Sequence, residues 1–199
     1  MKNLLLSVSI VLGSSFLHAE TNQFFSSDEL RLKSTFVGEN LENAIGVSVR
    51  FDLSGVADKP NTNDFLLNSF FTDDGANGKN VAFAPELSSA NIICSIISKH
   101  YLGAKCDLEP DSLVTTRSEK ALIELPLHQV KSQRASGIRL DAMLAAPNMV
   151  SIKVGSQLSK DVRVIAIKND LIILGSSNGD YQIVPFARGN RSGLFKQGL

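Results

Sequence analysis

The sequence of 199 residues contains no tryptophan, two cysteines and three histidines. It also lacks an excess of charge of either sign, because 20 Lys and Arg residues balance 20 Asp and Glu residues. A chain without a basic surplus has no broad electrostatic field to attract nucleic acid or an anionic membrane. We therefore expect no nucleic-acid partner.

The motifs that carry most enzyme chemistry are absent as well. The sequence contains no G-x-S-x-G, H-E-x-x-H, P-loop or G-x-G-x-x-G. Beyond the N-terminal segment the remaining histidines are His100 and His128, whereas an enzyme needs a nucleophile with a base, or a metal site. Glu119 and Glu124 lie close in the sequence, and a solvated strand edge explains them. We expect a non-enzyme with no catalytic residues, cofactor or metal; the alternative is an exported hydrolase with carboxylates far apart in the chain.

One long apolar run exists, and it lies at the N-terminus. Lys2 precedes the run from Leu4 to Leu17, which only small residues interrupt, and Ala19 puts a small residue before Glu20. A secretory signal has an apolar core of roughly 7–15 residues, shorter than the roughly 20 that span a bilayer. The pattern predicts a signal peptide over residues 1–19 and a periplasmic or secreted protein without a membrane span after signal removal. The alternative is an uncleaved anchor.

The two cysteines, Cys94 and Cys106, enclose a short loop. In an oxidising compartment, an even number of cysteines at short spacing favours a disulfide. A metal site is the alternative, but His100 is the nearest further soft ligand and zinc takes about four ligands. We expect a Cys94–Cys106 disulfide.

The first part of the mature chain has mixed patterns. Residues 20–45 are polar and acidic, which predicts a flexible N-terminal segment. The stretch from Gly46 to Leu53 alternates apolar and polar residues, as a half-buried strand does. Residues 64–71 suit a short helix or strand, residues 73–78 a turn, and residues 81–84 a strand.

A helix is predicted from Ser88 or Ser89 to about Leu102, because isoleucines recur on one stripe and Gly103 supplies a stop. We place this helix in an α+β domain over residues 46–128 and expect the disulfide to attach it to the returning chain.

The downstream part is the most regular. Residues 129–136 have the composition of a linker, and residues 137–187 form short apolar alternations separated by turn residues, which predicts a small antiparallel β domain. The strands are expected at 138–144, 150–154, 162–167, 171–174 and 181–186, followed by a mobile basic tail over residues 188–199. The fold class is therefore α+β, with an upstream α+β part and a downstream β-meander or small β-sandwich.

Residues 150–186 carry a resemblance to a known family. A strand that ends in Val154-Gly155 is followed by Val-Arg-Val-Ile-Ala-Ile, a turn, Leu-Ile-Ile-Leu, a glycine-bearing turn and Tyr-Gln-Ile-Val-Pro-Phe. This order resembles the C-terminal β domain of PilP-type pilus biogenesis proteins and, more distantly, the homology region of GspC secretion proteins. The turn Lys168-Asn169-Asp170 lacks the usual glycine, and the helix with its cysteine pair has no counterpart in the pattern.

The resemblance implies a non-enzymatic periplasmic scaffold of a type IV pilus or type II-like secretion machine. Its expected protein partners are the periplasmic region of an outer-membrane secretin or the inner-membrane assembly platform, bound through an edge strand and an apolar face. The candidate partner-binding residues are Val162, Val164, Ile165 and Ile167. The alternatives are that residues 162–167 form a central strand of a sandwich, and that the protein is a secreted binding protein or effector.

Overall fold

The computed structural model describes residues 23–57, 64–70, 81–135, 141–143 and 148–186. The predicted signal peptide, the turn at residues 73–78 and the basic tail lie outside these residues. Part of the strand expected at 138–144 also lies outside them.

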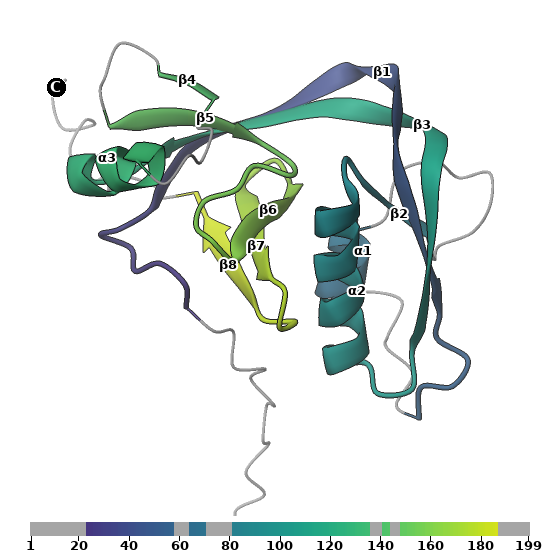
Figure 1. Cartoon of the computed structure of the whole chain (residues 1–199). Coiled ribbons are helices and arrows are strands. Elements are labelled where there is room, and N and C mark those ends of the chain that lie inside the picture. Colours follow the sequence, from purple (N-terminus) through teal and green to yellow (C-terminus); the bar gives the residue numbers. More distant parts are fainter. Residues whose placement is uncertain (1–22, 58–63, 71–80, 136–140, 144–147, 187–199) are drawn as a thin grey trace, which may run out of the picture.

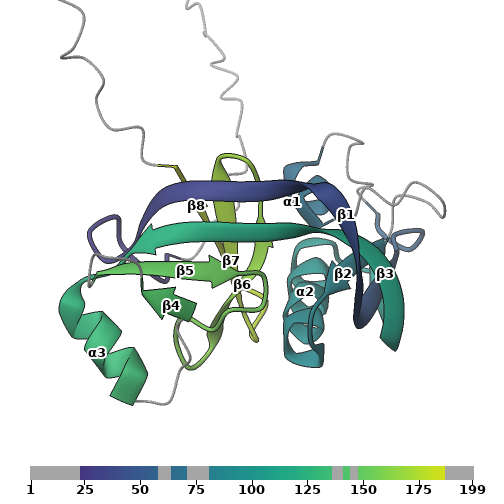
Figure 2. The ribbon, with the colours of Figure 1, turned by 90° about the horizontal axis from the view of Figure 1, so that it is seen from above.

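The fold is built on a long antiparallel ribbon of β1 (Arg31–Asp52) and β3 (Lys105–Glu124). Three short strands complete this sheet: β2 (Val81–Ala84), β4 (Asp141–Met143) and β5 (Met149–Lys153), in the order β2-β1-β3-β5-β4. β2 pairs with β1 at one end of the ribbon, and β5 pairs with β3 at the other end. In the described residues, the middle of the ribbon is therefore formed by β1 and β3 alone. Figure 2 shows β2 and β5 at its two ends.

A second sheet is an antiparallel meander of β6 (Val162–Ile167), β7 (Leu171–Ser176) and β8 (Tyr181–Pro185). The helices are α1 (Phe65–Phe70), α2 (Leu87–His100) and α3 (Leu127–Ala135). Figure 1 shows the ribbon passing over the meander and descending beyond α2, so that α2 lies between the meander and the ribbon.

The meander contributes to two hydrophobic cores, one on each face. Ile165 and Ile173 pack with α2, α1 and the β2 end of the ribbon, whereas Val164, Ile172 and Leu174 pack with β5 and the β5 end of the ribbon. Strands that are buried on both faces read as nearly continuous apolar runs. This double burial explains why the β6 sequence is apolar at almost every position.

The contact between α2 and the meander depends on Gly175 in β7. A Cβ atom built at this residue would lie 2.7–2.9 Å from side-chain carbons of Ile92, Ile165 and Ile96. Such distances are shorter than real packing allows, so the absence of a side chain lets the helix approach the sheet closely.

Most of the regular elements confirm the sequence prediction. The fold is α+β, the stretch from Gly46 to Leu53 belongs largely to β1, and residues 64–71 contain helix α1. The predicted long helix is α2, which ends before Gly103 with its positive φ of 94°. Its N-cap is Glu86 rather than Ser88 or Ser89. The four strands expected from residue 150 onward are β5 to β8 and are antiparallel.

The structure differs from the expected organisation in three places. Residues 31–45, expected within a flexible segment, belong to β1, because β3 pairs with them by main-chain hydrogen bonds although their side chains are largely exposed. Residues 129–135, expected in a linker, belong to α3. The proposed upstream and downstream parts also share one sheet, since β5 pairs with β3.

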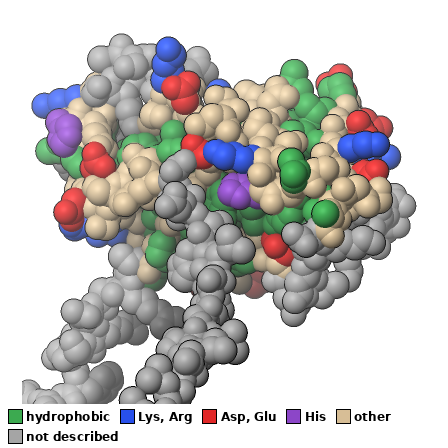
Figure 3. All heavy atoms as spheres, turned by 90° about the horizontal axis from the view of Figure 1, so that it is seen from below, with side chains coloured by type: hydrophobic (Ala, Val, Ile, Leu, Met, Phe, Trp, Pro, Cys, Tyr) green, Lys and Arg blue, Asp and Glu red, His purple; other side chains and the backbone are tan. Residues whose placement is uncertain are grey.

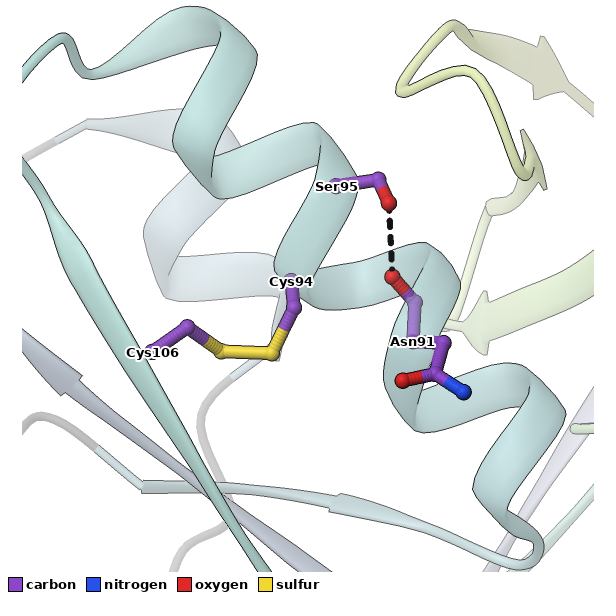
Figure 4. Close-up of a disulfide and its surroundings, with 4 residues drawn as sticks. All are labelled: Asn91, Cys94, Ser95 and Cys106. Atoms are coloured by element: carbon purple, nitrogen blue, oxygen red, sulfur yellow. Dashed lines mark hydrogen bonds between the residues drawn. A yellow bond between two sulfur atoms is a disulfide. The ribbon is translucent and has the colours of Figure 1, made fainter.

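The predicted disulfide is present between Cys94 and Cys106, twelve residues apart in sequence. Figure 4 shows that it joins α2 to the beginning of β3, on the side of the helix away from the meander. On the same helix the Ser95 hydroxyl donates a hydrogen bond to the carbonyl oxygen of Asn91 at 2.9 Å. The bridge thus holds α2 against the sheet that it covers.

Replacing both cysteines by serine (Cys94→Ser with Cys106→Ser) is expected to lower the free energy of unfolding by about 3 kcal/mol, because the closed loop no longer restricts the unfolded chain. Urea unfolding followed by circular dichroism measures the change. Reductant should destabilise the native protein by the same amount and leave the double variant unaffected. An unchanged urea midpoint in the variant would contradict the structural role of the bridge.

Gly175→Val is expected to lower the free energy of unfolding by about 1–3 kcal/mol, because the added side chain overpacks the contact with α2. Thermal and urea unfolding measure it. Gly38→Ala in β1 is the matched control, since its Cβ would stand 3.4 Å or more from Ser118. The control should change stability by less than about 0.5 kcal/mol. Equal effects of the two variants would show that the close approach at Gly175 is not the cause.

Candidate functional site

Strand β3 has an unpaired edge in the middle of the ribbon. β1 pairs with one side of β3 along almost its whole length, whereas β5 covers the other side only from Lys120 to Glu124. Within the described part of the chain, no strand pairs with this second side of β3 at residues 113–119. The main-chain groups directed to that side are a template on which another strand can pair.

The edge stays open because the chain turns away at the end of β5. Gly155 has φ of 90°, a conformation that favours glycine, and its N–H donates to the Val164 carbonyl oxygen at 2.7 Å. The Val164 N–H in turn donates to the Ser156 carbonyl oxygen at 2.9 Å. The segment after β5 therefore covers the outer edge of β6 instead of continuing along β3.

A cavity of about 410 Å³ lies along this open edge. Six consecutive residues of β3, Thr115–Lys120, line one side of it. The opposite walls are apolar and come from four different elements: Phe70 of α1, Phe83 of β2, Ile93 of α2, and Ile165 with Ala166 of β6. Consecutive residues of one strand at a cavity wall are expected where the cavity follows the strand edge, because side chains alone would contribute every second residue.

The Phe83 ring owes its position to Gly46 on the neighbouring strand. A Cβ atom at Gly46 would lie 2.4 Å from the Phe83 ring and 2.5 Å from the Ala84 carbonyl oxygen. The glycine therefore allows the aromatic ring to lie against the main chain of β1 at one end of the cavity. The sequence offered no sign of this contact, because it joins residues far apart in the chain.

Basic side chains outnumber acidic ones around the cavity. Arg117, Lys120, Lys153 and Lys168 line it together with a single carboxylate, that of Glu119. This local excess contrasts with the zero net charge of the whole chain. The site therefore combines an apolar floor, formed by the walls opposite β3, with a basic rim of Arg117, Lys120, Lys153 and Lys168 and the unpaired edge of β3.

Exposed apolar side chains continue from the cavity along the ribbon. Leu41, opposite Arg117, is 60% exposed and lines the cavity. Ile45 and Leu113, which are direct cross-strand partners, are 70% and 71% exposed. Leu41 and Ile45 are separated by four residues on β1 and so share one face of the ribbon with Leu113 and Arg117. This strip extends the apolar surface available to a bound chain.

The structure places the four sequence-predicted partner-binding residues in the core. The exposed fractions of Val162, Val164, Ile165 and Ile167 are 7%, 0%, 3% and 0%. Ile165 alone reaches the cavity wall. The outer edge of β6 is also occupied, by residues 155–159 of the same chain. β6 is thus buried in the manner of a central strand, and the unpaired strand edge that borders the cavity is that of β3.

The open edge of β3 was not identified from the sequence. β3 contains Pro110 and many charged or hydroxyl side chains, and its middle lacks the alternation of a half-buried strand. The cluster Val114-Thr115-Thr116 is the one β-branched signal in this stretch.

Glu119 and Glu124, the two neighbouring carboxylates considered from sequence, do not converge. They are five residues apart on β3 and therefore point to opposite faces of the strand. Glu124 forms an ion pair with Lys33 at 2.6 Å, and the hydrogen bond from Lys33 lowers the pKa of the Glu124 carboxyl. Glu119, but not Glu124, lines the cavity.

A second group of titratable side chains lies where α1, the end of α2 and β8 meet. The Tyr101 hydroxyl donates to Asp64 Oδ1 at 2.6 Å, and the same oxygen accepts from the Leu67 N–H at 3.0 Å. His100 packs edge-on against Tyr181, with ring centroids 5.0 Å apart. The underside of the molecule in Figure 3 shows histidine, basic and acidic side chains close together.

The electrostatics of this group suit a structural role. Burial raises the pKa of Tyr101, with a further contribution from Asp64, and burial also raises the pKa of Tyr181. Both phenols therefore stay protonated at neutral pH. Burial, together with the charge of Lys99, lowers the pKa of His100. None of these side chains lines the cavity along β3.

No three His, Cys, Asp or Glu side chains of the described segments gather closely enough to hold a metal ion. No helix within these segments has the length and apolar character needed to cross a membrane. Comparison with protein-family models, curated proteins and solved structures finds no match for this chain.

Lowering the pH is expected to destabilise the protein through His100. Its pKa is lowered in the folded state, so the unfolded chain, with a histidine pKa near 6.5, binds more protons. Stability from this group is complete above that value and is lost as the pH falls through it. The measurement is urea unfolding between about pH 8 and pH 5. The His100→Gln variant should lose less stability over this pH range, because only the protonation of carboxylates then lowers its free energy of unfolding. Parallel pH profiles would contradict this origin.

Proposed function

We propose that this protein is a non-enzymatic, exported binding module that accepts an extended segment of a protein partner as an added strand on β3. The observation that carries the proposal is the unpaired edge of β3 along a cavity with an apolar floor. In strand addition, main-chain hydrogen bonds supply affinity and alternate side chains supply specificity. The unpaired main-chain groups of β3 and the apolar cavity that would receive the side chains lie next to each other.

The dimensions of the site agree with such an occupant. A cavity of about 410 Å³ falls within the range of ordinary ligand sites. Alternate side chains of an added strand would point into it, toward Phe70, Ile93 and Ile165, while the intervening ones would remain in solvent. The exposed strip of Leu41, Ile45 and Leu113 gives the same partner a second apolar contact.

Export is the part of the proposal that the disulfide supports. Disulfides persist in oxidising compartments such as the periplasm and are rare in the cytosol. The bridge between Cys94 and Cys106 therefore agrees with the apolar N-terminal run as an export signal. Edman sequencing of the mature protein would locate the cleavage site.

In its narrowest form, the proposal makes the protein a scaffold of a type IV pilus or type II-like secretion machine. The partner would then belong to the periplasmic region of a secretin or to the inner-membrane assembly platform. The support for this form is the sequence resemblance of residues 150–186 to PilP-type and GspC proteins. A secreted binding protein or effector would use the same strand edge. Cell fractionation separates the two, because a machine component stays in the envelope whereas an effector leaves the cell.

The strand-addition proposal is tested with a random peptide library displayed on phage and selected against the full chain. Thr115→Trp is expected to weaken binding of the selected peptides at least about tenfold, because the indole fills the cavity. Val114→Trp is the matched control: it adds the same ring to the neighbouring residue, which points to the other face of β3 and lies outside the cavity wall. Its effect should stay within about twofold.

Hydrogen exchange then shows where the peptides bind. Amides of residues 113–119 are expected to exchange more slowly in the complex, because an added strand accepts their hydrogen bonds. Circular dichroism and thermal unfolding verify that both tryptophan variants are folded. Failure to select any peptide, or equal binding by the two variants without protection of β3, would overturn the proposal.

A further inference from the structure

Three lysines gather at the end of the open edge where β5 leaves β3. Lys153, the last residue of β5, is the cross-strand partner of Lys120. Lys168 directly follows β6, and the next carbonyl oxygen, that of Asn169, accepts a hydrogen bond from the Thr35 hydroxyl at 2.5 Å. Thr35 is paired with Ala121, so Lys168 lies at the same end of the edge. Within the described chain none of the three lysines forms an ion pair.

The other end of the edge is apolar. Phe83 lines the cavity from β2, on the side of β1 away from β3, and its register through Ser48 to Glu109 puts it at a level of β3 before Leu113. Leu113 itself is exposed, and Phe70 lines the cavity wall. An occupant of the edge therefore meets three ammonium groups at one end and aromatic and aliphatic side chains at the other.

β5 limits the open edge at one end. Within the described residues no strand pairs with this side of β3 from Lys105 to Glu119, and β5 occupies the line beyond Glu119. A short extended segment that leaves the line near Lys120 fits this edge. The basic side chains favour an acidic partner segment over the β3 edge of a second copy, which carries the same basic side chains.

We infer that the occupant is an acidic segment of a protein partner that runs antiparallel to β3, with carboxylates at its N-terminal end beside Lys120, Lys153 and Lys168 and apolar side chains after them. The inference rests on the proposed function and adds the chemistry and direction of the partner. The direction follows from β5, which runs antiparallel to β3 and whose line the occupant continues. Carboxylates at this end neutralise like charges that the fold brings together.

The test uses the same random peptide library, selected in parallel against the full chain and against the Lys120→Glu/Lys153→Glu variant. Peptides selected on the native protein are expected to carry Asp or Glu in their N-terminal half and apolar residues after them. Their dissociation constants should rise at least about tenfold in the charge-reversed variant, and also when NaCl is raised from about 50 to about 500 mM. Lys131→Glu/Lys160→Glu makes the same charge change at exposed positions outside this cavity and should alter binding less than about twofold.

The possible results separate this inference from the proposed function. Peptides without carboxylates that still protect the amides of residues 113–119 would overturn the acidic partner and leave strand addition standing. Equal weakening by the two charge-reversed variants would overturn the placement of the carboxylates at these lysines. A selection that yields no edge-binding peptide would overturn both. Sedimentation equilibrium provides a further check, since a dimer that pairs through β3 would also overturn the inference.

Discussion

The main-chain pairing of β1 with β3 is the constraint on which the rest of the structure depends. This ribbon takes part in both hydrophobic cores, because its β2 end packs with α2 and its β5 end packs with the meander. Its middle is held chiefly by the ladder of hydrogen bonds, since Leu41, Ile45 and Leu113 remain exposed. Within the described residues a bridge of this kind leaves the strand edges of its middle without partners, and the candidate site lies along the edge of β3.

Sequence patterns predicted the elements that bury a clear face. Helix α2 has its isoleucine stripe, and β6 and β7 have dense β-branched residues, so all three were expected near their observed positions. The first half of β1 and most of β3 were missed, because their side chains are mostly in solvent and pairing with a distant strand stabilises them. Residues 129–135 were misread because the polar composition of α3 resembles that of a linker.

The candidate site was the least predictable part, for a topological reason. Whether β3 has a free edge depends on where β5 stops, and β5 stops because Gly155 turns the chain toward β6. The sequence did indicate that strand-edge binding deserved consideration, but it directed attention to Val162 and Val164. These residues are apolar because two cores enclose their sheet. From one sequence, double-sided burial cannot be distinguished from an exposed binding face.

The disulfide has a consequence for how this topology is reached. Pairing of Arg31 with Glu124 closes a loop that contains a large part of the chain. Contacts between residues so distant in sequence make folding slow. Cys94 and Cys106 are close in sequence and connect α2 to the beginning of β3. If the disulfide forms before β1 pairs with β3, it joins α2 and the beginning of β3 into one local unit. Fewer separate segments of the chain then have to meet when the ribbon forms. Oxidising conditions would then speed assembly of the ribbon as well as stabilise the finished fold.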